Sequence, residues 1–165
     1  FNITVYGESG VGKSSLIHQY LTGNEEVVAL ASNKKEHSYR KYVPKSESHS
    51  AFVLNILDTC GNYEYESGCQ FEKAIRADAV LLICSPDQQT SIDRIETFIN
   101  RIERLKKRKL SEIPSLIVFN KSDIEENILV KSEDAKKLAD QYGITFIECT
   151  AKKQSKVNDL FDGAL

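Results

Sequence analysis

The chain reads Gly7-Glu8-Ser9-Gly10-Val11-Gly12-Lys13-Ser14 directly after an apolar run, 1–6, and directly before a stretch with helical spacing, 15–21. This octapeptide satisfies the pattern G-x-x-x-x-G-K-[ST], in which glycines let backbone N–H groups turn toward phosphate oxygens. The following helix would present its positive dipole end to the same point. The pattern therefore predicts a phosphate-binding loop in which Lys13 reaches the terminal phosphates and the Ser14 hydroxyl binds Mg²⁺.

Outward from this loop, short apolar runs alternate with segments of helical spacing, which is the pattern of βαβ units. Helices are expected over 87–107 and over a segment that runs from Ser132, as N-cap, to a stop at Gly143. Strands are expected at 1–6, 38–43, 51–57, 79–84, 115–119 and 144–148. Residues 44–48 would join the second and third strands as an antiparallel hairpin. The predicted fold is an α/β P-loop three-layer fold, with a six-stranded, mostly parallel sheet, one antiparallel edge strand and helices on both faces.

Length and composition indicate one domain spanning residues 1–165. The chain has 165 residues, of which 41% are hydrophobic, enough for one core. Its 22 basic and 24 acidic side chains leave a net charge of −2, which argues against binding to nucleic acid. The sequence begins without Met and ends in an apparent helix at 162–165, so we expect a domain trimmed at both ends. We also expect a monomer.

Four scattered cysteines indicate the compartment. Cys60, Cys69, Cys84 and Cys149 form no C-x-x-C pair and no disulfide-dense spacing. This favours a reducing environment, and we expect a cytoplasmic protein.

The third predicted strand runs into Leu57-Asp58-Thr59-Cys60-Gly61. A carboxylate at this position, such as Asp58, could hold Mg²⁺ through water, and the Gly61 N–H could lie near a γ-phosphate.

Two later motifs also follow predicted strands, namely Asn120-Lys121-Ser122-Asp123 and Thr150-Ala151-Lys152. A carboxylate such as Asp123 can accept both the N1–H and the exocyclic amine of guanine, a donor pair that adenine lacks. The stems of Lys121 and Lys152 could cover the faces of the base. Together these motifs predict a guanine pocket.

In this order, the four motifs resemble those of the small GTPases of the Ras superfamily over essentially the whole chain. The resemblance implies GTP or GDP, one Mg²⁺ and two switch segments. Within the superfamily, residues 36–41 are similar to the effector region of Ras proper, whereas Ser9 is similar to the Rab branch.

The resemblance also assigns residues to roles. Residues for the phosphates would be Ser9, Gly10, Val11, Gly12, Lys13, Ser14 and Ser15. Residues for the base would be Asn120, Lys121, Asp123, Thr150, Ala151 and Lys152. The metal would be held by Ser14 and, through water, by Asp58. Catalysis would involve Asn62, Gly61 and Lys13.

The sequence departs from this family in its switch segments. The invariant switch Thr falls on Lys34, which has no acceptor for a cation. Ser32 could substitute if the loop shifts, or Lys34 could contact the γ-phosphate directly. Asn62 stands where a Gln usually orients the attacking water, and its shorter side chain predicts slow hydrolysis.

Two further departures lie beside the nucleotide. Residues 25–28 lack the aromatic side chain that usually covers the guanine, so spontaneous exchange is expected to be faster. Cys60 replaces a small Ala near the γ-phosphate, and we expect a buried, inert thiol there.

Two functional hypotheses follow. In the first, the chain is a GTP-hydrolysing switch that binds effector proteins through Glu36 to Lys41 and through switch II, and that is acted on by an exchange factor and a GTPase-activating protein. In the second, it is an adaptor that binds nucleotide but neither senses nor cleaves the γ-phosphate. A P-loop kinase is a distant third, because it would not need the guanine motif. Membrane attachment, at the cytoplasmic face, is expected only through a C-terminal tail missing from this sequence.

Overall fold

The computed structural model describes residues 1–23, 36–45, 50–61 and 75–165. In this part of the chain, six strands form one sheet in the order β2-β3-β1-β4-β5-β6. Strand β2 pairs with β3 antiparallel, and every other neighbouring pair is parallel. The predicted six-stranded, mostly parallel sheet with one antiparallel edge strand is confirmed.

The strands lie close to their predicted positions, with ends shifted by no more than one residue. Their bounds are β1 Asn2–Gly7, β2 His37–Val43, β3 Phe52–Asp58, β4 Ala79–Cys84, β5 Ser115–Phe119 and β6 Thr145–Glu148. The helices are α1 Lys13–Thr22, α3 Gln89–Lys106, α4 Ser132–Tyr142 and α5 Gln154–Asp162, with a short 3-10 helix, η2, at Leu110–Glu112.

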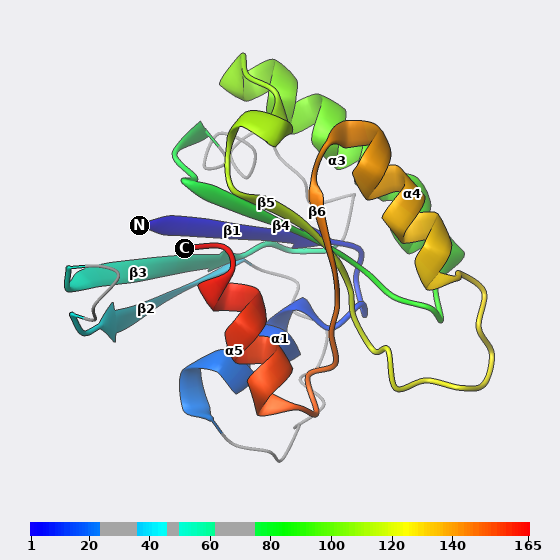
Figure 1. Cartoon of the computed structure of the whole chain (residues 1–165), viewed down its shortest axis with the longest axis horizontal. Helices are drawn as coiled ribbons and strands as arrows, with labels where there is room; N and C mark the ends of the chain where they lie inside the picture. The colour runs from blue at the N-terminus through cyan, green and yellow to red at the C-terminus, as the bar shows by residue number, and fades with distance from the viewer. Residues whose placement is uncertain (24–35, 46–49, 62–74) are drawn as a thin grey trace.

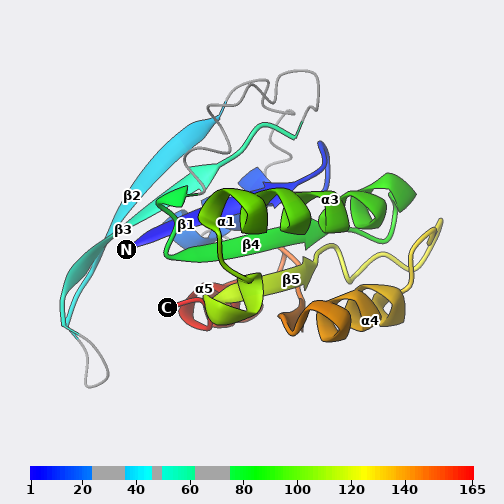
Figure 2. The same ribbon diagram turned by 90° about the horizontal axis from the view of Figure 1, so that it is seen from above.

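The helices cover both faces of the sheet, with α1 and α5 on one face and α3 and α4 on the other (Figures 1 and 2). Strand β4 shows why its sequence is continuously apolar. Ala79, Leu81 and Ile83 belong to the core beneath α1 and α5, whereas the alternating residues Val80, Leu82 and Cys84 belong to the core beneath α3 and α4. A central parallel strand covered on both faces needs apolar residues at every position.

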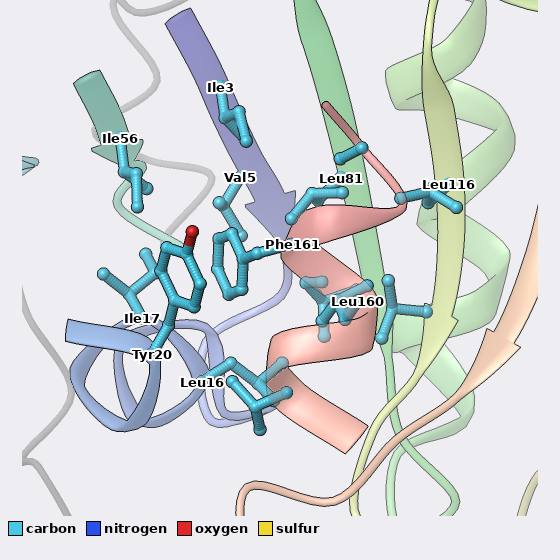
Figure 3. Close-up of a cluster of buried hydrophobic side chains, with 14 of the residues drawn as sticks. Ile3, Val5, Leu16, Ile17, Tyr20, Ile56, Leu81, Leu116, Leu160 and Phe161 are labelled. Atoms are coloured by element: carbon cyan, nitrogen blue, oxygen red, sulfur yellow. The ribbon is translucent and has the colours of Figure 1, made fainter. Parts of the chain in front are cut away.

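In the core beneath α1 and α5, a helix near the N-terminus packs against a helix near the C-terminus. Figure 3 shows Tyr20 of α1 and Phe161 of α5 facing each other, with ring centroids 4.2 Å apart. Leu16 and Ile17 lie beside them and pack toward Val5 of β1. This packing holds α1, and with it the loop that precedes α1, against the sheet.

Three expected helix ends are corrected. Helix α4 has Lys131, with extended backbone, as its N-cap, and Ser132 is the first helical residue with no side-chain cap. Helix α3 begins at Gln89, because Asp87 lies in the preceding turn and its carboxylate binds Lys121. Helix α5 ends at Asp162, where Gly163 is the C-cap, so residues 163–165 follow the helix. The expected stop of α4 at Gly143, with a left-handed φ of 64°, is confirmed.

Candidate functional site

The predicted motifs meet at one edge of the sheet. They follow β1, β3, β5 and β6, which run in the same direction across the sheet. The carboxyl ends of parallel strands point to a common edge, which is where ligands bind in open α/β sheets. The topology therefore places the loops at 7–14, 58–61, 120–123 and 150–152 on one side of the molecule.

The phosphate loop has a backbone that only glycine adopts readily. Gly10 and Gly12 have φ values of +85° and +95°, which L side chains rarely adopt. Gly12 is also the N-cap of α1. Lys13 is 6% exposed, and its ammonium lies 2.9 Å from both the Gly7 and Glu8 carbonyl oxygens. The lysine thus closes the loop on itself beside the first turn of α1, where the helix N-terminus favours an anion.

Ser14 and Asp58 bring two oxygen donors together from α1 and β3. The Ser14 hydroxyl donates to Asp58 Oδ2 at 2.5 Å, and Asp58 is 2% exposed. Hydroxyl and carboxylate oxygens suit Mg²⁺, which usually takes only one or two protein ligands together with phosphate and water oxygens. The pair fits the predicted metal position. Within the described ranges, no cluster of three or more His, Cys, Asp or Glu side chains could hold a metal ion.

Asp123 is held at both carboxylate oxygens by the loop after β6. The Thr150 hydroxyl donates to Oδ1 at 2.6 Å, and the Lys152 ammonium lies 2.5 Å from Oδ2. Burial raises the pKa of the Asp123 carboxyl, but the hydrogen bonds from Lys152 and Thr150 outweigh it, so the pKa lies below its ordinary value of 3.8. Each oxygen keeps a further lone pair, so the orientated carboxylate can still accept two N–H groups of a base.

Asn120 connects the base loop, which comprises residues 120–123, with the phosphate loop, which comprises residues 7–14. Its Nδ2 donates to the Val11 carbonyl oxygen at 2.8 Å, and the residue is 1% exposed. A Cβ on Gly12 would overlap the same Nδ2 atom. The two halves of the site are therefore in direct contact, and Gly12 is required for that contact as well as for its own backbone conformation.

One site residue was missed by sequence reasoning, which had placed Asp87 in a helix. The Asp87 carboxylate lies 2.7 Å from the Lys121 ammonium and orients this side chain beside the base loop. Burial raises the pKa of Asp87, but hydrogen bonds from Lys121 and Ser85 lower it below its ordinary value of 3.8. The position of Asp87 in the sequence could have indicated its place in the site, because it follows β4 at the same edge of the sheet as the recognised motifs.

The remaining predicted residues divide into four groups. Gly61 lies against the phosphate loop, where its carbonyl oxygen accepts the Ser9 N–H at 3.0 Å. Val11, Cys60 and Ala151 are buried, at 0%, 1% and 8% exposure, so any contact of Val11 or Ala151 with nucleotide would be made by the backbone. Ser15 lies in the first turn of α1. The positions Ser32, Lys34, Asn62 and 25–28 lie outside the described residues.

The lowered pKa of Asp87 predicts a loss of stability in acid. A carboxyl whose folded-state pKa is lowered contributes stability above its unfolded pKa, and the contribution disappears as pH falls through the folded value. We expect Asp87→Asn to lower the free energy of unfolding by up to about 1 kcal/mol near neutral pH, since the pair is partly exposed. The difference from the unsubstituted protein should shrink below the ordinary value of 3.8.

Urea unfolding between about pH 7 and about pH 2 measures this difference. Asp140→Asn is the matched control, because Asp140 is exposed on α4. A difference for Asp87→Asn that stayed constant across this range would contradict the assignment.

Comparison with known proteins agrees with this geometry. The family model described as "Ras family" matches residues 2–165. The chain is 34% identical to Ras-like protein 1 of Saccharomyces cerevisiae over 161 residues, which make up 98% of this chain and 50% of the yeast protein. The chain thus spans about half the length of this curated relative. None of the helices in the described ranges combines the length and apolarity needed to span a bilayer.

Fold, motif order and these similarities lead to one conclusion: the chain belongs to the Ras family, whose members are small GTPases that bind GTP or GDP with Mg²⁺ and act as switches.

Proposed function

We propose that this chain binds GTP and GDP as a molecular switch and hydrolyses GTP slowly. The observation that carries the proposal is Asp123, whose two carboxylate oxygens are fixed by Thr150 and Lys152 beside the phosphate loop. A fixed carboxylate is the group that distinguishes guanine from adenine, because guanine offers two adjacent N–H donors. A phosphate loop alone would leave the base undetermined.

The described residues would act mainly by position and charge. Lys13 would exchange its bonds to the Gly7 and Glu8 carbonyls for nucleotide phosphates, while the N–H groups at the start of α1 bind the same oxygens. Ser14 and Asp58 would hold Mg²⁺, which supplies positive charge against the charge that develops on the phosphates. Since phosphoryl transfer depends mostly on positioning and electrostatic stabilisation, these groups would supply much of the catalysis, and the attacking water would still have to be oriented.

Asn62 sets the expected rate. Its amide can orient a water molecule as a glutamine amide does, but it is one methylene shorter, and a displacement of about 1 Å can cost on the order of 10²-fold in rate. We expect single-turnover phosphate release to be slow in the unsubstituted protein and roughly 10-fold or more faster in Asn62→Gln.

The measurement is phosphate release from protein preloaded with GTP in the presence of Mg²⁺. The rate of nucleotide dissociation, measured for both proteins, serves as the control and should not change. Phosphate release without acceleration by Asn62→Gln would mean that Asn62 does not limit hydrolysis.

The adaptor hypothesis is the second candidate, and the sequence at Lys34 favours it. A lysine cannot ligate the cation that the usual Thr binds, so the γ-phosphate would not be sensed through that contact. If both proteins load GTP and neither releases phosphate, the adaptor function is supported and the switch with slow hydrolysis is not.

For partners, we propose that effectors bind Glu36 to Lys41 together with switch II. Strand β2 lies at one end of the sheet order, so none of the described strands pairs with the outer edge of residues 37–41, and such an edge is a common binding surface. An exchange factor, a GTPase-activating protein, a monomeric state and a cytoplasmic location belong to the same proposal.

A further inference from the structure

Helix α3 contacts the phosphate loop through two side chains that the motifs of the site do not include. The Gln88 Nε2, at the N-cap of α3, donates to the Ser9 carbonyl oxygen at 3.0 Å. Six residues further along, the Arg94 guanidinium lies 2.9 Å from the Glu8 carboxylate. Two consecutive loop residues are thus bound from the same helix.

The Glu8 carboxylate is an unfavourable charge for a loop that binds phosphates. The backbone of Glu8 belongs to the binding loop itself, since its carbonyl oxygen accepts a hydrogen bond from the Lys13 ammonium at 2.9 Å. Its side chain is 16% exposed, so solvent screens its charge only in part. A negative side chain here would repel nucleotide phosphates unless a cation compensates it, and the Arg94 guanidinium is placed to do so.

The bound segment also contacts Gly61, in the loop that follows β3. The Ser9 N–H donates to the Gly61 carbonyl oxygen at 3.0 Å. A Cβ on Gly61 would overlap Ser9 N and would lie 2.6 Å from the Glu8 carbonyl carbon. Residues 8 and 9 are therefore contacted both by Gln88 and Arg94 and by Gly61, so movement of the loop would disturb both sets of contacts.

We propose that Arg94 and Gln88 are positioning residues of the nucleotide site. Arg94 neutralises the Glu8 carboxylate and directs it away from the phosphates, and Gln88 fixes the Ser9 carbonyl so that the Ser9 N–H stays bound to Gly61. Neither residue needs to touch the nucleotide. This inference rests on the proposed nucleotide binding and extends it to helix α3.

Loss of the Arg94 charge should have a salt-dependent effect that a loss of stability alone would not produce. We expect Arg94→Gln to weaken GDP binding about 5-fold at low salt, because Glu8 is left unpaired beside the phosphates, and the loss should shrink as salt screens the charge. Glu8→Gln should bind GDP at least as tightly as the unsubstituted protein. The double variant Glu8→Gln/Arg94→Gln should recover the affinity that Arg94→Gln lost.

The test measures GDP affinity by titration for these three variants, with Arg104→Gln as the matched control. Arg104 is exposed on the same helix, so it reports the loss of one positive charge away from the loop. A double variant as weak as Arg94→Gln would overturn the neutralising role. So would Arg94→Gln binding GDP as tightly as the Arg104→Gln control.

Backbone amide exchange tests the contact with Gly61 without relying on nucleotide binding. Hydrogen exchange at the Ser9 N–H should be at least 2-fold faster in Gln88→Ala and in Arg94→Gln than in the Gln89→Ala and Arg104→Gln controls. Equal exchange would overturn the inference. Failure of the unsubstituted protein to bind GDP would instead overturn the proposed function, and Ser9 exchange would still decide whether α3 positions the loop.

Discussion

Asp123→Asn is expected to lower the affinity for GDP by roughly 10²- to 10³-fold while the protein gains affinity for xanthosine diphosphate. The carboxylate accepts two N–H groups of guanine, and each charge-assisted hydrogen bond contributes more than a neutral one. Asparagine supplies an acceptor and a donor in place of two acceptors. Xanthine has a carbonyl where guanine has its amine, so it matches the asparagine, and guanine does not.

The structure adds a reason for the size of this effect. Thr150 and Lys152 hold the Asp123 carboxylate, so the group is orientated before the base arrives and little conformational freedom is lost on binding. Titration with both diphosphates measures the change, and Glu125→Gln, an exposed carboxylate two residues away, controls for net charge. Unchanged GDP affinity in Asp123→Asn would show that the guanine assignment is wrong.

Gly12→Ala is expected to have the second large effect, a loss of nucleotide affinity of about 10²-fold or more together with a lower melting temperature. The backbone of Gly12 has a φ of +95°, and the new Cβ would overlap the Asn120 Nδ2 that donates to the Val11 carbonyl. The loop must therefore change conformation or lose its connection with the base loop. Either change displaces the N–H groups that bind phosphate.

Gly10→Ala distinguishes the effect of backbone strain from the effect of steric overlap with Asn120. Gly10 has a similar φ of +85°, but its Cβ would meet only Gln88 Nε2 at 3.5 Å, an ordinary contact. It carries the conformational cost, on the order of 1–2 kcal/mol, without the collision. Melting curves and GDP titrations should therefore show a clearly smaller loss for Gly10→Ala. Equal losses would mean that contact with Asn120 is unimportant.

Local patterns in the sequence predicted most of the fold correctly. The apolar runs of β4 and β5 gave the correct bounds for both strands, because a strand covered on both faces must be apolar throughout. The helix ends were less accurate. Asp87 and Ser132 both looked like residues that begin a helix, yet Asp87 binds Lys121 instead and Ser132 lies inside the first turn. The Asp87 side chain has a long-range partner and therefore does not begin the helix.

The sequence by itself indicated the strands, the glycine-rich phosphate loop and the guanine motif, because each is a contiguous pattern, and the order of these motifs carried the resemblance to the family. Only the tertiary structure decided what holds these motifs in place. Lys121 is bound by Asp87, 34 positions away, and the Ser9 carbonyl by Gln88, 79 positions away. The strand order β1-β4-β5 brings the turn after β4 between the phosphate loop and the base loop, and that order follows from the packing of the whole sheet, which no single motif contains.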